Sequence, residues 1–134
     1  MNQSSFPGPV GTNLGARLRD LCILVVEDEP IVAMLIEDML TDLGCRQVLH
    51  ANGVPEALAL LHTRLPDAAI LDVNLKNVRV YPVAEYLAAA RIPFIFATGY
   101  GRSGVAENWK DTLVIQKPFE QSTLENALGC ILCP

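Results

Sequence analysis

The fold is decided by the stretch Leu21-Cys22-Ile23-Leu24-Val25-Val26-Glu27-Asp28-Glu29-Pro30. Its first six residues form an uninterrupted apolar run, which is typical of a parallel strand that is buried on both faces. Three acids then end the run abruptly, and Pro30 suits the first turn of a helix. We therefore expect a strand over 21–26 that passes directly into a helix, with acidic side chains at the junction.

The same strand-then-helix unit recurs along the rest of the chain. Apolar residues after Pro30 repeat at the spacing of one helical face, and Gly44 stands where that helix would be capped. Further strands are expected at 48–51, 68–71, 93–97 and 113–116, and further helices within 54–65, 83–90 and 124–131. Residues 100–111 form the weakest element, because two glycines oppose a helix there, and we expect at most a short helix near 105–109.

Strands that alternate with helices predict an α/β fold in which helices cover both faces of a parallel sheet. We expect the flavodoxin-like (βα)5 three-layer sandwich with strand order 2-1-3-4-5. The 134 residues suffice for one domain, which we place at 20–134. Residues 1–19 contain several prolines and glycines and are expected to be a flexible N-terminal tail, although Leu14 and Leu18 are compatible with a short helical turn.

Composition argues against several other classes of protein. Apolar residues make up 51% of the chain and charged residues 19%, which excludes a disordered protein. The net charge is −5 and the ten Lys and Arg are scattered, which disfavours nucleic-acid binding. We find no apolar run of membrane-span length, no secretory signal pattern, and four cysteines without metal-site spacing. We expect a cytoplasmic monomer or weak homodimer without membrane contact.

Polar side chains follow four of the expected strands. Glu27 and Asp28 follow the first, Asp72 the third, Thr98 the fourth and Lys117 the fifth. The carboxyl ends of parallel strands share one edge of the sheet, so these groups should converge. Clustered carboxylates repel unless a cation intervenes, and hard oxygen ligands suit Mg²⁺. A central carboxylate beside Mg²⁺ and an ammonium can become an aspartyl phosphate, which makes Asp72 the candidate nucleophile.

Four segments of the chain resemble the receiver domain of two-component response regulators. They are Val25-Val26-Glu27-Asp28-Glu29-Pro30, Leu71-Asp72-Val73-Asn74-Leu75, Ala97-Thr98-Gly99 and Lys117-Pro118-Phe119. The resemblance implies that Asp72 accepts a phosphoryl group from a sensor histidine kinase or a histidine phosphotransfer protein. It implies Mg²⁺ ligands at Glu27, Asp28, Asp72 and the backbone carbonyl of Asn74. It also implies a switch hydroxyl at Thr98, a phosphate-contacting Lys117, and a cis Lys117–Pro118 bond.

Two features depart from the common pattern of that family. Val114 stands where the family usually has an aromatic switch residue, three positions before the lysine. The segment Phe96-Ala97-Thr98-Gly99, with Tyr100 after it, resembles a subfamily of single-domain receivers that is common in alphaproteobacteria. Tyr100 is therefore our candidate for the mobile aromatic, the alternative being an ordinary loop tyrosine. Trp109 has two interpretations as well, a partner anchor or a side chain packed back on the sheet.

We expect no attached DNA-binding or catalytic output domain, because 134 residues suffice for one domain. We expect a single-domain response regulator that acts as a switch, relay or phosphate sink, and whose only catalysis is Mg²⁺-dependent autophosphorylation and autodephosphorylation of its own aspartate. The rival hypothesis is a phosphohydrolase that forms an aspartyl phosphate from small molecules. That enzyme would need a second acid two residues after its nucleophile, where Asn74 stands. A flavin or nucleotide carrier would need a phosphate-binding loop after the first strand. Acids stand there instead and would repel a phosphate group.

Overall fold

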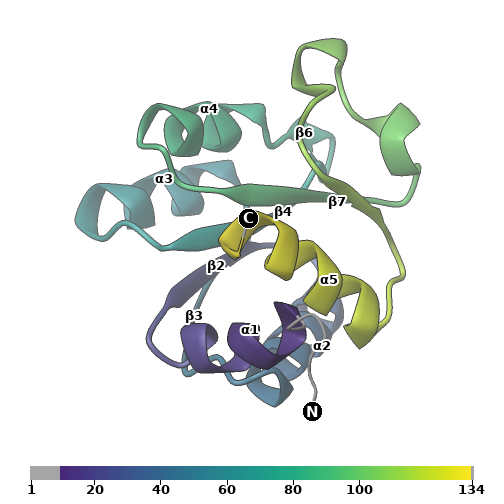
Figure 1. The fold of residues 1–134 in the computed structure, drawn as a ribbon. Coiled ribbons are helices and arrows are strands. Elements are labelled where there is room, and N and C mark those ends of the chain that lie inside the picture. Colours follow the sequence, from purple (N-terminus) through teal and green to yellow (C-terminus); the bar gives the residue numbers. More distant parts are fainter. Residues whose placement is uncertain (1–9, 134) are drawn as a thin grey trace.

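The computed structural model describes residues 10–133, and a five-stranded parallel sheet runs through its centre (Figure 1). The strands lie in the spatial order β3 (Gln47–Ala51), β2 (Cys22–Val26), β4 (Ala68–Asp72), β7 (Phe94–Thr98) and β8 (Val114–Gln116). When these five strands alone are counted from 1 to 5 along the chain, their spatial order is 2-1-3-4-5. The predicted fold class and topology are therefore confirmed.

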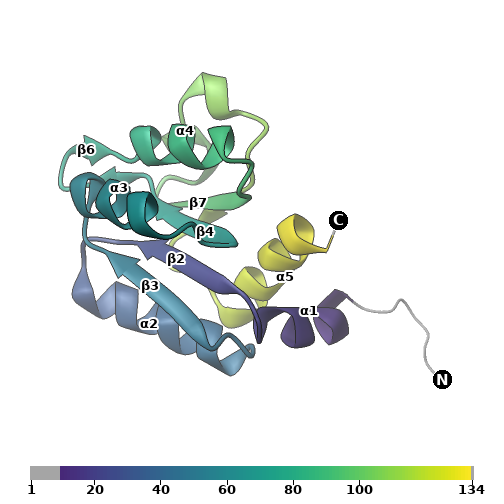
Figure 2. The same cartoon turned by 90° about the vertical axis from the view of Figure 1, so that its left-hand side faces the viewer.

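Helices cover both faces of the sheet, as the apolar runs of the strands require (Figures 1 and 2). On one face lie α1 (Val10–Leu18), α2 (Pro30–Asp42) and α5 (Gln121–Leu132), and on the other lie α3 (Val54–Thr63) and α4 (Tyr81–Ala89). All five residues of β2 are buried, and Ile23 packs on the first face while Leu24 packs on the second. Two apolar cores therefore sandwich each central strand. No helix in the described part of the chain is long and apolar enough to cross a membrane.

The prediction of a flexible N-terminal tail over residues 1–19 is wrong for residues 10–18. Helix α1 occupies Val10–Leu18, and the side chains of Leu14 and Leu18 are buried in the core beside α5. The contact depends on Gly44, which has a φ of 113° after α2 and whose Cβ, if present, would lie 2.9 Å from the carbonyl oxygen of Gly15. The helix is thus part of the domain, and the remaining predicted tail, residues 1–9, lies outside the described residues.

Two further elements stand near the carboxyl edge of the sheet. A short antiparallel hairpin, β5 (Asn74–Leu75) and β6 (Val78–Arg79), follows β4 directly and was not predicted. The weak segment after β7 forms two short 3₁₀ helices, η1 (Gly101–Gly104) and η2 (Glu107–Trp109). The short helix expected near 105–109 is confirmed by η2, whereas η1 was not expected. Both elements border the site that the strand ends create.

Candidate functional site

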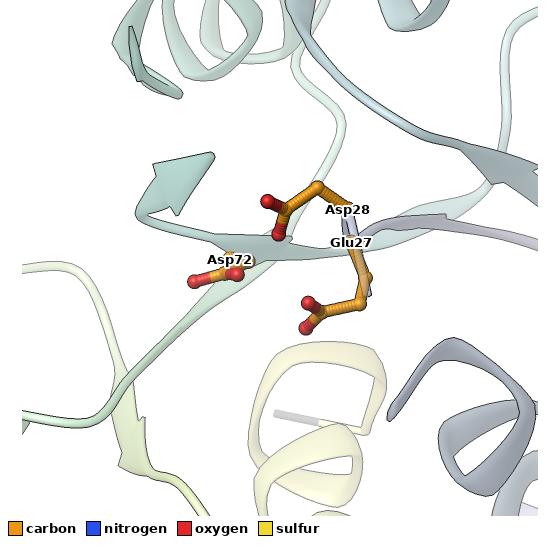
Figure 3. A group of neighbouring side chains, drawn as sticks. All are labelled: Glu27, Asp28 and Asp72. Carbon is orange, nitrogen blue, oxygen red and sulfur yellow. The ribbon is translucent and has the colours of Figure 1, made fainter. Parts of the chain in front are cut away.

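The register of the sheet brings the predicted acids together. Val26 of β2 pairs with Leu71 of β4, so the residues that follow β2 lie beside the last residue of β4. Glu27, Asp28 and Asp72 each offer a carboxylate oxygen, and these oxygens lie within 4.8 Å of one another. Figure 3 shows the side chains of Glu27 and Asp28 leaving adjacent positions in different directions, with Asp72 beside them.

Lys117 closes the cluster from the end of β8. Its Nζ donates hydrogen bonds to Oε1 of Glu27 at 3.0 Å and to Oδ2 of Asp72 at 3.2 Å. Glu27 is 1% exposed and Asp72 is 6% exposed, so the ammonium and both acids sit in a largely desolvated setting. The Lys117–Pro118 bond is cis, as the resemblance implies. One ammonium is therefore shared between two buried acids.

Burial and excess negative charge in this cluster disfavour the ionised forms of Glu27 and Asp72. Burial raises the pKa of Glu27 to about 7, with the negative charge of Asp72 adding to the shift. Burial likewise raises the pKa of Asp72, although the Lys117 ammonium opposes it. Burial alone would lower the pKa of Lys117, but its bonds to the two acids outweigh burial and raise it. The set of three carboxylate donors with excess negative charge fits a hard divalent cation such as Mg²⁺.

Backbone groups hold the acids in place. The N–H of Glu29 donates to Oε2 of Glu27 at 3.2 Å, and the N–H of Asn74 donates to Oδ1 of Asp72 at 3.3 Å. Nε2 of His50 lies 2.8 Å from the backbone carbonyl oxygen of Glu27. No sequence motif connects His50 with this edge, and its place near the end of the neighbouring strand is the signal that points there. The carbonyl of Asn74 as a metal ligand stays a prediction.

Thr98 ends β7 on the other side of Asp72 and is 3% exposed. Its hydroxyl oxygen accepts a hydrogen bond from the backbone N–H of Tyr100 at 3.2 Å. The side chain of Tyr100 is 74% exposed, whereas Val114 of β8 is half-buried. The structure therefore places an exposed aromatic two residues after Thr98, and its role as the mobile switch stays a prediction.

Trp109 packs back on the domain instead of projecting into solvent. Its ring stacks on Tyr81 with centroids 6.2 Å apart, and it meets Phe94 and Phe96 edge-on at 5.8 and 5.7 Å. The hydroxyl of Tyr81 also accepts a hydrogen bond from the backbone N–H of Ala106 at 2.8 Å. Of the two interpretations of Trp109, packing on the sheet is confirmed. These contacts attach η2 to the start of α4.

All the predicted site residues except the buried Glu27 line one cavity of about 320 Å³ at the carboxyl edge of the sheet. Its lining includes Asp28, Asp72, Asn74, Thr98, Tyr100 and Lys117. Lys76 and Asn77 of the β5–β6 hairpin line it too. These two residues were not predicted, because a hairpin of such short strands leaves almost no alternation pattern in the sequence. An ammonium and carboxylates around one open cavity can bind an anionic group through the cation and a metal through the acids.

Comparison with known proteins agrees with this geometry. Residues 23–129 match the model of the response regulator receiver domain family. SdrG from Sphingomonas melonis Fr1 is 45% identical, with 84% of this chain and 96% of that chain covered and a TM-score of 0.75. The BeF3-activated conformation of SdrG from Pseudomonas melonis Fr1 is also 45% identical, with 83% and 95% covered and a TM-score of 0.72.

Similarity to curated proteins is lower and covers only part of them. The probable transcriptional regulator ycf27 of Guillardia theta is 30% identical over 115 residues, which are 82% of this chain and 44% of that protein. The chain spans about half the length of the curated relatives it matches. The family model covers well over half of the chain and corresponds to the sheet and the acidic cluster described above. The chain therefore belongs to the response regulator receiver domain family.

Proposed function

We propose that the protein is a phosphorylation-controlled receiver in which Asp72 accepts a phosphoryl group from a histidine of a sensor kinase or of a histidine phosphotransfer protein. One observation carries the proposal: Asp72 ends the central strand, opens on the cavity, and lies between two further acids and the ammonium of Lys117. No other acid in the described residues combines these neighbours with a place on the cavity.

The transfer uses groups that are already in position. An oxygen of Asp72 bonds to phosphorus while the bond from phosphorus to the donor imidazole nitrogen breaks, and the imidazole leaves with the electron pair. Lys117 lies 3.2 Å from Asp72 and would follow the negative charge onto the phosphoryl oxygens. The Thr98 hydroxyl accepts its present hydrogen bond from Tyr100, so its own proton is available to a phosphoryl oxygen.

Glu27, Asp28 and Asp72, together with the backbone carbonyl of Asn74, would hold Mg²⁺. When bound, Mg²⁺ supplies positive charge against the carboxylates and the phosphoryl oxygens. The acids supply the oxygen ligands, and the backbone N–H groups of Glu29 and Asn74 keep two of them oriented. In this proposal the protein catalyses only the phosphorylation and dephosphorylation of its own aspartate.

The donor protein needs a docking surface that adjoins the acceptor. An apolar groove of about 260 Å³ runs between α2 and the loop after β8, and Lys117 lines both this groove and the acidic cavity. Leu35 of α2 lines the groove and is more than half exposed, and so are Ile31 and Met34 on the same helix, which lie outside the groove lining. We infer that a helix of the kinase or phosphotransfer protein packs here and brings its histidine to Asp72.

The likeness to SdrG supports a proposal for the biological role, because the similarity extends over 96% of that chain. We infer a stand-alone receiver that acts in the cytoplasm as a switch, relay or phosphate sink. The surface formed by Thr98, Tyr100 and the two 3₁₀ helices would carry the change to a partner.

A phosphotransfer assay tests the proposal. The donors are purified, phosphorylated sensor kinases and histidine phosphotransfer proteins of the source organism. Each donor is mixed with the parent protein, Asp72→Asn and Met34→Glu, and loss of label from the donor histidine is followed over time. At least one donor should transfer rapidly to the parent, not at all to Asp72→Asn, and slowly to Met34→Glu. Transfer to Asp72→Asn at the parent rate, or from no donor to the parent, would contradict the proposal.

A further inference from the structure

The β5–β6 hairpin carries two cations at the edge of the acceptor cavity. It begins two residues after Asp72 and reverses at Lys76 and Asn77, which have φ angles of 51° and 72°. Two consecutive left-handed residues are the hallmark of the tight type I′ turn. The hairpin is anchored below its tip, because Leu75 is 3% exposed and Val80 is fully buried. Its tip is therefore a fixed structural feature beside the site.

Neither cation of the hairpin forms an ion pair with an acid in the described part of the chain. Both ion pairs found within residues 10–133 belong to Lys117, and the exposed side chains of Lys76 and Arg79 take part in none. Lys76 lines the cavity that contains Asp28, Asp72 and Lys117. Arg79 lines the adjoining cavity with Asn74, Thr98 and Tyr100. The two cations thus flank the acceptor and its switch hydroxyl without a partner of their own.

We infer that Lys76 and Arg79 are phosphoryl-positioning residues, which hold the oxygens of the group on Asp72 in addition to Lys117. The inference rests on the proposed function, since it needs a phosphoryl group at Asp72. A phosphoryl group adds close to two negative charges and three strong hydrogen-bond acceptors. With Mg²⁺ bound, Glu27, Asp28 and the phosphoryl group would carry about four negative charges against about three positive charges on Mg²⁺ and Lys117, so an excess of negative charge remains. An ammonium and a guanidinium on a fixed hairpin can contact those oxygens with little reorganisation.

Loss of the two cations should affect the affinities for a phosphoryl analogue and for Mg²⁺ differently, whereas structural damage would weaken both. Cations beside the cavity attract a phosphoryl group but repel a divalent metal ion. Removing them should weaken the binding of a phosphoryl analogue and leave Mg²⁺ binding unchanged or tighter. A distorted hairpin that disturbed Asp72 would instead weaken both, because Asn74 also holds the Asp72 carboxylate.

The test uses beryllofluoride (BeF₃⁻) as the phosphoryl analogue, and Mg²⁺ alone as the second probe. Affinities are measured by amide NMR titration for the parent, for Lys76→Gln/Arg79→Gln, and for the control Arg46→Gln/Lys110→Gln. The control removes two exposed charges that line neither cavity. At saturating Mg²⁺, the hairpin variant should bind BeF₃⁻ about 3- to 10-fold more weakly than the parent, while the control matches the parent. The difference should shrink at high ionic strength.

Three results would overturn the inference. Equal BeF₃⁻ affinity in the parent and the hairpin variant would overturn it while leaving the proposed function intact. A similar loss of BeF₃⁻ and Mg²⁺ affinity in the hairpin variant would assign the hairpin a structural role only. Absence of BeF₃⁻ binding to the parent itself would overturn the proposed function and this inference together.

Discussion

The backbone of Gly104 packs directly against the hydroxyl of Thr98. A Cβ added to Gly104 would lie 2.6 Å from the Thr98 hydroxyl oxygen and 3.0 Å from the Cβ of Tyr100. The same hydroxyl accepts a hydrogen bond from the N–H of Tyr100, so η1 and the second residue after β7 both contact it. A shift of Thr98 toward Asp72 must therefore change the contacts of η1, which links the acceptor site to the 3₁₀ segment.

Substitution of Gly104 by alanine should destabilise the protein, because the new methyl group collides with a buried side chain. We expect the free energy of unfolding to fall by about 1–3 kcal/mol in urea titrations. Gly99→Ala is the matched control, since a Cβ there meets nothing within 4 Å, and it should change stability by less than about 0.5 kcal/mol. Equal free energies of unfolding in the two variants would contradict this, because the close approach of Gly104 to Thr98 would then not affect stability.

Phosphorylation should slow hydrogen exchange in residues 99–111. In our account the phosphoryl group attracts the Thr98 hydroxyl, and the bonds between Thr98, Tyr100 and η1 reorder with it. Thr98→Ala should still accept phosphate but should lose this added protection. Exchange mass spectrometry with and without phosphodonor measures both. If Thr98→Ala gains the same protection as the parent, the signal leaves the site by another route, such as α2.

Mg²⁺ should stabilise the fold by mass action, since it binds the native acid cluster and not the unfolded chain. We expect the melting temperature of the parent to rise with millimolar Mg²⁺, and to rise much less in Asp28→Asn. Asp38→Asn removes the same charge from an exposed position further along α2 and should respond like the parent. The assignment of the metal ligands fails if Asp28→Asn keeps the full rise.

Without metal, stability should depend on pH through Glu27. Its pKa is raised from 4.5 to about 7 in the folded protein, so the folded state favours the protonated form. This contribution is fully present below about pH 4.5 and is lost as pH rises through 7. In EDTA, the free energy of unfolding should therefore fall between about pH 5 and pH 8, and less so in Glu27→Gln. The same fall in Glu27→Gln would place the titrating group elsewhere.

The sequence was sufficient to predict the sheet and the residues at its carboxyl edge. Buried parallel strands are continuous apolar runs, so their ends are sharp, and the strand order then fixes that Asp28 and Asp72 are neighbours. The structure confirms this neighbourhood, because Val26 pairs with Leu71 and the residues that follow β2 therefore lie beside Asp72. Trp109 could be assigned only to two alternatives, because aromatic packing between η2, α4 and β7 depends on tertiary contacts.

Other features depend on contacts that leave no local pattern. Helix α1 lies in a glycine-containing segment, and only the burial of Leu14 and Leu18 against α5 explains its formation. The β5–β6 hairpin has two-residue strands and a Lys76–Asn77 turn without glycine, so neither alternation nor turn composition indicates it. The cations that it brings to the site were missed for the same reason.

The central claim is that Asp72 is the phosphoacceptor, and intact mass spectrometry after incubation with acetyl phosphate and Mg²⁺ tests it most directly. The parent and the control Asp38→Asn should each gain about 80 Da, the mass of one phosphoryl group, and EDTA should prevent the gain. Asp72→Asn should gain nothing under the same conditions. Undiminished labelling of Asp72→Asn, or no labelling of the parent, would contradict the account.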